Sequence, residues 1–457
     1  MADRISAQPA QRLIRPAGGP VDAVIAVPGS KSLTNRALLL AALAEGESVL
    51  DNALFSEDSG WFITGLRQLG ITVEADAGRA QIRVRGQGGH FPASEADVFV
   101  GNSGTTARFL VAAAALGAGA YRFDGVPRMR QRPIGPLLAA LRDLGARVSA
   151  AQSEGGEGFP LTVHAAGLRG GAATLDSSAS SQYLTALLQV APYAAGDVTI
   201  RLVGDIVSMP YMAMTLQVMA DFGVTVERDL ADGSGSRAGD GAPSEERRYR
   251  NLTVRAGQRY RPQRYTVEPD ASNASYFFAA AALTGGRVRV PGLTADSRQG
   301  DARFVEVLAR MGCDVEYGAD YLEVRGPARL RGIEVDLNGM SDTAQTLAAI
   351  APFAAEPVTI RGIGHIRHKE TDRIAAIVTE LRRLGVRAEE GPDWVTIHPS
   401  PVRAAVVETY ADHRMAMAFA VAGLAAPGIQ IADPGCVAKT FPDFFARFER
   451  LYGAPYT

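Results

Sequence analysis

Six times along this chain of 457 residues, a cluster of small polar residues is followed at once by an Ala/Leu-rich apolar segment. Ser, Thr, Asn and Asp are the residues that cap helix N-termini, so each cluster predicts the start of a helix. Because a helix that is apolar almost all round is normally buried, these segments predict a set of buried helices. The clusters begin near Ser30, Gly101, Ser177, Asp270, Ser341 and Asp412.

A second, amphipathic segment follows each buried helix and usually ends at a glycine, as at Gly70 and Gly385. After five of these six stops the sequence predicts a strand, a short turn and another strand. The repeated unit is therefore strand, buried helix, strand, exposed helix and hairpin, with a period of roughly 70 to 90 residues. The sixth unit lacks the hairpin, and the strand-like run Arg12–Arg15 resembles the missing member. We therefore expect the N-terminus to pair with the C-terminal half.

The six units divide most simply into two domains of three units each, which agrees with the about two to four domains expected from the length. We expect residues 22–262 to form an N-terminal domain, and residues 1–21 and 263–457 to form a C-terminal domain. A Gly- and Ser-rich charged stretch, 231–241, lies within a predicted hairpin of the third unit. Its composition predicts a mobile surface loop.

Charge and apolar patterning exclude several classes of protein. A formal net charge of −2 argues against nucleic-acid binding, which normally needs a basic surface. No apolar run is long and clean enough to span a bilayer, and the N-terminus lacks the basic-then-apolar order of a signal peptide. Two cysteines, Cys313 and Cys436, indicate a reducing compartment without a disulfide framework. We therefore expect a cytoplasmic protein without nucleic-acid or membrane partners, and we further expect it to be a monomer.

Lysine is rare in this chain: of 47 Lys and Arg residues, three are lysines. Lys31, Lys369 and Lys439 all lie in polar clusters beside other cations. An ammonium is a compact point charge with a titratable proton, and a guanidinium cannot replace it where such a group is needed. We therefore expect functional roles for the three lysines.

Several predicted helix starts also carry cations. The first cluster places Lys31 and Arg36 at the positive end of a buried helix, where unpaired backbone N–H groups already favour anions. This arrangement predicts binding of a phosphate or a carboxylate. Further clusters of the same kind are Gly101–Arg108, Arg128–Pro133, Ser177–Gln182, Arg367–Arg373, Asp412–Arg414 and Lys439–Pro442.

Four of these clusters also allow a purely structural interpretation. Gly101–Arg108 could be an ordinary helix start, and Ser177–Gln182 could be an ordinary serine-rich loop. Arg128 and Arg130 are more simply explained as a solvated basic turn. On a helix, Lys369 and Arg373 would be i,i+4 neighbours, where like charges repel unless an anion lies between them. The alternative there is an exposed helix with salt bridges to the neighbouring carboxylates.

Two familiar kinds of site are excluded by the spacing of residues. Gly29–Ser32 resembles a nucleotide-binding P-loop, but the template needs glycines where Ser30 and Ile25 stand. The six histidines are not spaced as metal ligands, so no metal site is predicted.

Taken together, the clusters resemble the enolpyruvyl transferase family, and within it the 5-enolpyruvylshikimate-3-phosphate (EPSP) synthases. The resemblance extends from about Leu13 to Phe445 and rests on a specific set of motifs. These motifs are Pro28–Ser32 with Asn35 and Arg36, Asn102–Thr105, Pro127–Met129 with Arg132–Gly135, Ser180–Gln182, Asp270–Ser272, Lys369–Arg373, Asp412–Met417 and Lys439–Pro442.

The resemblance implies an α/β fold of two domains, an inside-out α/β barrel with three repeated units per domain and a double crossover between them. It also implies transfer of the enolpyruvyl group of phosphoenolpyruvate to the 5-hydroxyl of shikimate 3-phosphate, with release of phosphate and without a cofactor. Both substrates are polyanions, which accounts for cationic clusters on a nearly neutral protein. The active site would lie in the cleft between the domains.

Carried over residue by residue, the resemblance implies four catalytic residues, with Asp342 taking the proton of the attacking hydroxyl and Glu370 protonating the methylene carbon. The four are Asp342, Glu370, Lys31 and Lys369. Shikimate 3-phosphate would bind to Lys31, Ser32, Arg36, Ser180, Ser181, Gln182, Ser208, Asp342, His365 and Lys369. Phosphoenolpyruvate would bind to Lys31, Gly104, Arg132, Gln182, Arg373, Arg414 and Lys439.

The sequence departs from the family pattern at two positions: His365 stands where many members have Asn, and Phe109 where the commoner pattern has Pro. The nearest alternative is the sister enzyme whose acceptor is UDP-N-acetylglucosamine. It carries a Cys in the loop before the Arg-Pro segment, and Asp124–Arg132 has none. A non-catalytic relative is disfavoured by the intact Asp342 and Glu370, and an RNA-end-processing relative by the lack of a basic excess.

Overall fold

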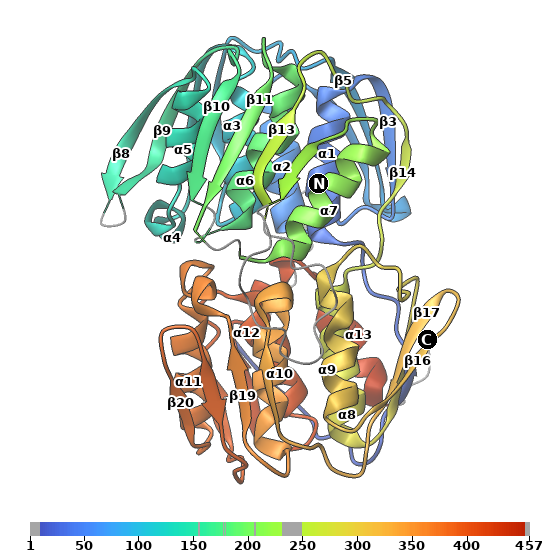
Figure 1. Cartoon of the computed structure of the whole chain (residues 1–457). Coiled ribbons are helices and arrows are strands. Elements are labelled where there is room, and N and C mark those ends of the chain that lie inside the picture. Colours follow the sequence, from blue (N-terminus) through green and yellow to red (C-terminus); the bar gives the residue numbers. More distant parts are fainter. Residues whose placement is uncertain are drawn as a thin grey trace.

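The computed structural model describes residues 10–153, 156–176, 178, 180–204, 207–230 and 249–452. The molecule has two halves, one above the other in Figure 1, and in each half the helices lie inside a surrounding set of sheets. The predicted loop at 231–241 lies outside the described residues. The strands on either side of it, β12 (Glu227–Leu230) and β13 (Tyr249–Val254), pair as an antiparallel hairpin.

The N-terminal half contains the first three units in the predicted order of helices and strands. The first unit consists of α1 (Lys31–Leu43), β3 (Glu45–Asp51), α2 (Glu57–Gln68), β4 (Thr72–Asp76) and β5 (Gln81–Gln87). The second consists of β6 (Glu95–Phe99), α3 (Gly104–Ala114), β7 (Ala118–Asp124), α4 (Pro127–Gln131), α5 (Gly135–Asp143), β8 (Arg147–Ser153) and β9 (Gly156–Ala166). The third consists of β10 (Gly171–Asp176), α6 (Ser181–Val190), β11 (Val198–Val203), α7 (Met209–Asp221), β12 and β13.

The C-terminal half repeats this order three more times. The fourth unit contains α8 (Ala271–Thr284), β15 (Arg287–Pro291), α9 (Phe304–Arg310), β16 (Asp314–Tyr317) and β17 (Tyr321–Arg325). The fifth contains β18 (Ile333–Asp336), α10 (Ala344–Ile350), β19 (Val358–Arg361), α11 (Arg373–Arg383), β20 (Ala388–Glu390) and β21 (Val395–Ile397). The sixth contains β22 (Ala405–Val407), α12 (His413–Ala422), β23 (Ile429–Ala432) and α13 (Phe444–Phe448).

Each complete unit forms one four-stranded sheet. In the sheet of order β6-β7-β9-β8, the first two strands are parallel and the hairpin adds two antiparallel strands. Alternate residues of these strands, such as Val98, Tyr121 and Val163, are buried on the face that covers the helices. The sixth sheet is completed by β1 (Gln11–Leu13), which pairs antiparallel with β23. This pairing confirms the expected contact between the N-terminus and the C-terminal half.

The two halves exchange one strand with each other. β2 (Asp22–Val24) pairs in parallel with β15 of the fourth unit, and β14 (Arg264–Thr266) pairs in parallel with β3 of the first unit. We expected the chain to cross between the halves at residues 22 and 263. The hydrogen-bonded pairing instead places Asp22–Val24 in the C-terminal half and Arg264–Thr266 in the N-terminal half, so both crossings come a few residues later.

The buried apolar residues give the same division into two halves. One core is built from residues between Leu33 and Val267. The other combines Ile14–Val27 with residues from Ala271 onward. Helices α1, α3, α8 and α12 are buried along almost their whole length, as their apolar sequences predict. Each half therefore has its own apolar core, and the chain passes between the two cores twice.

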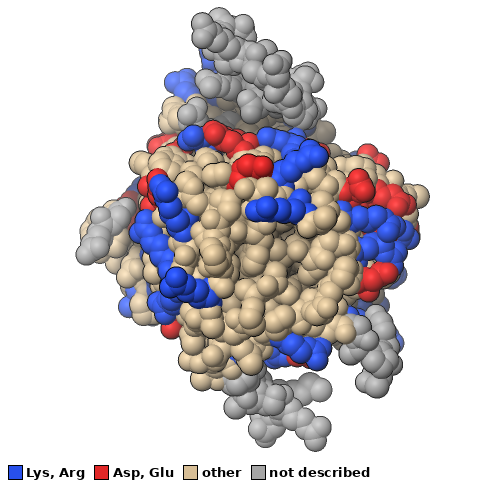
Figure 2. Space-filling view, turned by 90° about the horizontal axis from the view of Figure 1, so that it is seen from below, with Lys and Arg blue, Asp and Glu red and all other residues tan. Residues whose placement is uncertain are grey.

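Two features of the described surface bear on membrane and nucleic-acid contacts. Among the described residues, no helix is both long and apolar enough to cross a bilayer. Figure 2 shows the molecule from below, where Lys and Arg side chains lie interspersed with Asp and Glu around a largely uncharged centre. The described part of this face therefore presents no continuous basic surface for a nucleic acid.

Candidate active site

A cavity of about 40 Å³ lies between the two halves, and residues of both halves line it. The N-terminal half contributes Lys31, Ser32, Arg36, Gly104, Thr105, Arg132, Ser181, Gln182, Ser208 and Tyr211. The C-terminal half contributes Asp342, Lys369, Glu370 and Arg373. The resemblance had assigned a site role to all of these residues except Tyr211 and Thr105, the latter being part of the Asn102–Thr105 motif.

Helix N-termini build the upper wall of the cavity. Lys31, Gly104 and Ser181 are the first residues of α1, α3 and α6. Ser30, Ser103 and Ser180 cap these helices, and each cap side chain accepts a hydrogen bond from a backbone N–H of the first turn. Other first-turn N–H groups have no partner within their helix, so this wall favours an anion even before side-chain charges are counted.

Asp342 is the carboxylate at the centre of the site. Its side chain pairs with Arg373 at 3.0 Å and with Arg414 at 2.7 Å. Burial alone would raise the pKa of Asp342, but the nearby cations, Arg414 and Lys369 above all, outweigh it and hold the pKa well below its usual value. Asp342 is therefore an ionised carboxylate, in the state that a proton acceptor needs.

Glu370 is the second carboxylate of the site. Arg373 pairs with it at 2.7 Å, and the Lys439 ammonium lies 3.9 Å from its other oxygen. Burial would raise the pKa of Glu370, but Arg373, Arg132 and Lys439 together hold it well below the usual value. The ionised form of Glu370 thus depends on cations that an anionic ligand would also contact.

Lys369 and Arg373 do not share a helix, so the expected i,i+4 arrangement is wrong. Lys369 follows the short 3-10 helix η6 (Gly364–His368), and α11 begins only at Arg373. The Asp372 side chain caps α11 by accepting a hydrogen bond from the backbone N–H of Ala375. Both cations nevertheless line the cavity. Burial lowers the pKa of the Lys369 ammonium to about 8, an effect that Asp342 opposes and Arg373 adds to.

His365 joins the two halves beside the cavity. Its Nε2 atom lies 3.2 Å from the Ser208 hydroxyl of the N-terminal half and 2.9 Å from the Ser341 hydroxyl. Burial and the neighbouring Lys369 lower the pKa of His365 to about 3, so the ring is neutral near pH 7. A neutral imidazole can donate or accept one hydrogen bond at Nε2, and in this respect it can replace the Asn of other family members.

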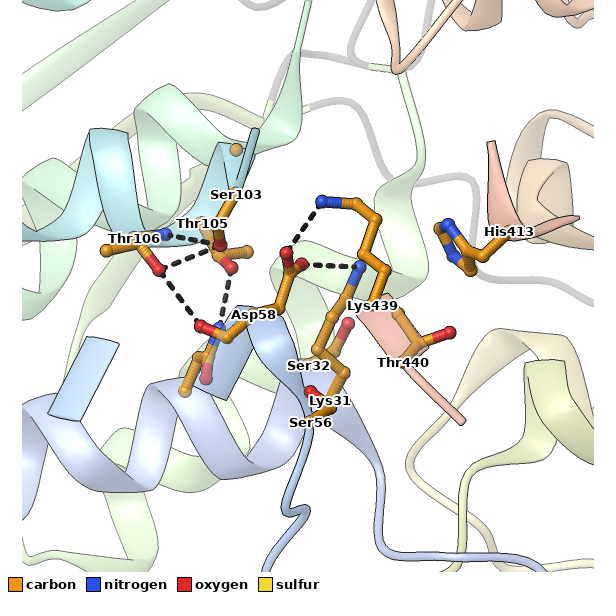
Figure 3. Close-up of polar contacts among 12 residues, drawn as sticks. Lys31, Ser32, Ser56, Asp58, Ser103, Thr105, Thr106, His413, Lys439 and Thr440 are labelled. Carbon is orange, nitrogen blue, oxygen red and sulfur yellow. Dashed lines mark hydrogen bonds and ion pairs between the residues drawn. The ribbon is translucent and has the colours of Figure 1, made fainter. Parts of the chain in front are cut away.

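Four predicted residues contact this group without lining the cavity. Ser180 is the cap of α6, and His365 bonds to Ser208, as described above. Arg414, near the start of α12, reaches Asp342. Lys439 lies at the end of the 3-10 helix η7 (Pro434–Lys439) and reaches Asp58 of the N-terminal half at 2.6 Å (Figure 3).

Three residues of the site carried no signal that we recognised in the sequence. The Tyr211 hydroxyl lies 2.8 Å from Asp301 and 3.2 Å from Asp342, and burial, with Asp342 nearby, raises the pKa of Asp301 to about 7. Asp58 accepts from Lys439 and lies 3.6 Å from Lys31. Only the capping pattern Ser56–Ser59 around Asp58 could have drawn attention to it.

Arg128 also differs from the prediction of a solvated basic turn. Its guanidinium donates to the backbone carbonyls of Lys369 and Glu370, at 3.0 and 3.1 Å. Arg130 does match the prediction, because it is exposed and pairs with Asp124 in the same half. Arg128 therefore connects the two halves directly at the rim of the site.

Two carboxylates, several cations and three helix N-termini thus surround one small cavity. Such a site can hold polyanions and move protons between them and the carboxylates. Within the described residues, no three His, Cys, Asp or Glu side chains are placed to hold a metal ion.

Comparison with known proteins shows to which family the chain belongs. The model of the EPSP synthase family (3-phosphoshikimate 1-carboxyvinyltransferase) matches residues 16–448. The chain belongs to the EPSP synthase family.

Relatives and solved structures agree with this assignment. A 3-phosphoshikimate 1-carboxyvinyltransferase of Nostoc punctiforme is 57% identical over 433 residues, which are 94% of this chain and 97% of that protein. The chloroplastic enzyme of Arabidopsis thaliana is 46% identical, over 94% of this chain and 82% of that protein. An EPSP synthase structure from Acinetobacter baumannii superimposes with a TM-score of 0.76 at 25% identity, covering 96% of this chain and 98% of that one.

The same comparisons settle the fold. An enolpyruvyl transferase from Streptomyces tendae, 18% identical, superimposes with a TM-score of 0.72 over 96% of this chain and 97% of that one. The two-domain, inside-out α/β architecture of six repeated units is thus the fold of this EPSP synthase family member. The rival assignment to the nucleotide-sugar transferase has no support from these relatives.

Proposed function

We propose that the cavity between the halves is the active site in which this EPSP synthase transfers the enolpyruvyl group of phosphoenolpyruvate to the 5-hydroxyl of shikimate 3-phosphate. The observation that carries the proposal is the convergence of cations from both halves on two ionised carboxylates. Polyanionic substrates would neutralise these cations, and one acid/base pair would serve both the addition and the elimination of phosphate.

The substrates would be divided between the two walls of the cavity. Shikimate 3-phosphate would lie against the helix starts of the N-terminal half and reach His365, Asp342 and Lys369. Phosphoenolpyruvate would lie against Gly104, Arg132, Gln182, Arg373, Arg414 and Lys439, where arginines suit bidentate contacts with carboxylate and phosphate. Lys31 would contact both substrates.

The electrostatics support distinct proton roles for the two carboxylates. Asp342, ionised beside Arg414, would accept the proton of the 5-hydroxyl. Glu370 is held ionised by Arg373, Arg132 and Lys439. When phosphoenolpyruvate binds these same cations, their hold on Glu370 weakens and its pKa rises, so that it can carry the proton for the methylene carbon.

We further propose that the protein acts as a cytoplasmic monomer of two domains, divided near Val27 and near Val267. Separate apolar cores on either side of these points support the division. Sedimentation of the purified protein at working concentration should give a single species of one chain, and a concentration-dependent dimer would contradict this part of the proposal.

The first experiment is to measure phosphate release from phosphoenolpyruvate, with shikimate 3-phosphate and then UDP-N-acetylglucosamine as the acceptor. We expect release only with shikimate 3-phosphate. Asp342→Ala and Lys31→Ala should each lower kcat by at least about 100-fold, in line with the loss of a positioned acid/base or charged group. Release only with the nucleotide sugar would overturn the proposal.

A further inference from the structure

Asp58 is a buried carboxylate that the mechanism above does not use. It lies in the first turn of α2, and its side chain is 2% exposed. The turn is fixed by a reciprocal capping box between Ser56 and Ser59. Asp58 does not line the cavity, and its two carboxylate oxygens face the ammonium groups of two lysines instead.

Two of the three lysines of the chain converge on this carboxylate from opposite halves. One oxygen of Asp58 lies 2.6 Å from the Lys439 ammonium, and the other lies 3.6 Å from the Lys31 ammonium (Figure 3). Lys439 also donates to the backbone carbonyl of Asn102 at 2.9 Å. Asp58 therefore forms an ion pair with a cation from each half of the molecule.

Electrostatics explains why a carboxylate is needed at this point. Closing the two halves brings two buried ammonium groups together, and like charges in a poorly solvated site repel strongly. A buried charge is also costly unless it is paired. One carboxylate between the two lysines removes most of this cost and fixes the position of both side chains. It leaves a net charge of +1 on the three groups to attract an anion.

We infer that Asp58 is a positioning residue for the transfer reaction. It holds Lys31 of one half and Lys439 of the other half in place, so that both can bind phosphoenolpyruvate. The inference rests on the proposed function, in which both lysines contact this substrate. It predicts that loss of Asp58 weakens the binding of phosphoenolpyruvate far more than that of shikimate 3-phosphate. Phosphoenolpyruvate needs both lysines, whereas shikimate 3-phosphate contacts Lys31 and also many other residues of the N-terminal half.

The test is Asp58→Asn, which keeps the shape of the side chain and removes its charge. We expect the KM for phosphoenolpyruvate to rise about 30-fold, as when one partner of a buried charge pair is lost, and kcat to fall. The KM for shikimate 3-phosphate should stay within about twofold, whereas a merely structural role would change both KM values together. The matched control is Glu57→Gln, since Glu57 is the preceding residue of the same helical turn and bonds to Trp61 rather than to a lysine.

A double-mutant cycle then tests the contact with Lys439 directly. Lys439→Gln alone should weaken phosphoenolpyruvate binding. Adding Asp58→Asn should then cause a smaller loss than the same substitution causes in the wild type, because Lys31 is the only one of the two lysines that Asp58 still holds. Additive losses, or an unchanged KM for phosphoenolpyruvate in Asp58→Asn, would overturn the inference.

Failure of the inference and failure of the proposed function give different results. If the proposed function is wrong, the wild-type protein and Glu57→Gln release no phosphate with shikimate 3-phosphate. Calorimetric titration with phosphoenolpyruvate alone needs no turnover and still compares wild type with Asp58→Asn. Equal affinities in that titration would overturn the role of Asp58 whatever the acceptor of the reaction is.

Discussion

Lys369 and Arg373 respond differently to the same buried surroundings. Burial lowers the pKa of the Lys369 ammonium to about 8, while the carboxylates of Asp412, Glu370 and Asp342 outweigh burial at Arg373 and raise its pKa further. The guanidinium therefore stays charged throughout the pH range in which an enzyme is normally assayed. The ammonium can lose its proton within the range in which an enzyme is normally assayed.

This difference predicts an alkaline limit to activity. Because its pKa is lowered to about 8, Lys369 becomes neutral in the free enzyme as the pH rises through this value. Activity should therefore be lost on the alkaline side. We expect kcat/KM to fall about tenfold per pH unit above this point, because kcat/KM reports ionisations of the free enzyme. The measurement is a pH profile of kcat/KM for shikimate 3-phosphate.

Lys369→Arg is the variant that tests the assignment. A guanidinium does not titrate in this range. The variant should therefore be less active, but its kcat/KM should not change with pH above about 8. If the variant keeps the same falling limb, another group is responsible for it.

At the scale of single residues, the cations of the site could be predicted from the sequence, but the buried groups that pair with them or with Asp342 could not. Lys31, Lys369 and Lys439 could be predicted, because lysine is rare in the chain and each one lies in a polar cluster. Asp58 and Tyr211 could not, because a lone Asp in a helix turn and a lone Tyr in a helix are common in any protein. Their importance comes from what the fold brings next to them.

Among the elements, the first turn of α3 lies close against two side chains of the site. A Cβ atom built on Gly104 would lie 2.5 Å from the Arg132 guanidinium and 2.9 Å from the Gln182 amide oxygen. Glycine therefore leaves room for these two side-chain ends at the helix start, and no unusual backbone angle is involved. The helix start, the guanidinium and the amide form one unit that faces the cavity.

Gly104→Ala should displace Arg132 and Gln182 from this position. We expect the KM for phosphoenolpyruvate to rise about tenfold, which corresponds to ~1.4 kcal/mol of lost binding. Steady-state kinetics with phosphoenolpyruvate as the varied substrate measures this. Gly135→Ala is the control, because Gly135 also begins a helix but has nothing within 4 Å of an added Cβ. Equal KM values for the two variants would contradict the packing argument.

At the level of elements, the prediction that Lys369 and Arg373 lie one turn apart on the same helix was wrong. The pattern of charges around them fits a helix face, but Asp372 can act either as a salt-bridge partner or as a cap. In the structure it does both: it pairs with Arg367 at 2.8 Å and caps α11, so the helix begins at Arg373 and Lys369 stays in the preceding segment. Local sequence alone does not show that an Asp within a charged run also begins a helix.

For the molecule as a whole, Arg128 is a direct connection between the halves. Its guanidinium on α4 donates to carbonyls of the segment that carries Lys369 and Glu370. Breaking this connection should favour separation of the halves and misplace both side chains. The bonded state of Arg128 is thus tied to the closed cleft.

Arg128→Ala should therefore increase the radius of gyration measured by small-angle scattering with both substrates bound, and should lower kcat about tenfold. Arg130→Ala is the matched control, because Arg130 is exposed and pairs within its own half. Identical scattering curves for wild type and Arg128→Ala would show that other contacts are sufficient to close the cleft.

The division into six units could be predicted at this scale, but the exchange of β2 and β14 could not. Both strands lie just before a buried helix, in the place that the repeat assigns to the first strand of a unit. Three-residue strands carry too little pattern to specify a partner, and either sheet offers an equivalent edge. The choice depends on the path of the chain between the two cores.

The exchanged strands also set the order in which the protein can assemble on the ribosome, which releases the N-terminus first. The N-terminal half is complete once β14 has emerged, since its remaining strands all precede Thr266. β2 must wait until β15 (Arg287–Pro291) has been made, and β1 must wait until β23 (Ile429–Ala432) has been made. Among the described strands, the first to be made therefore belongs to the last sheet to be completed.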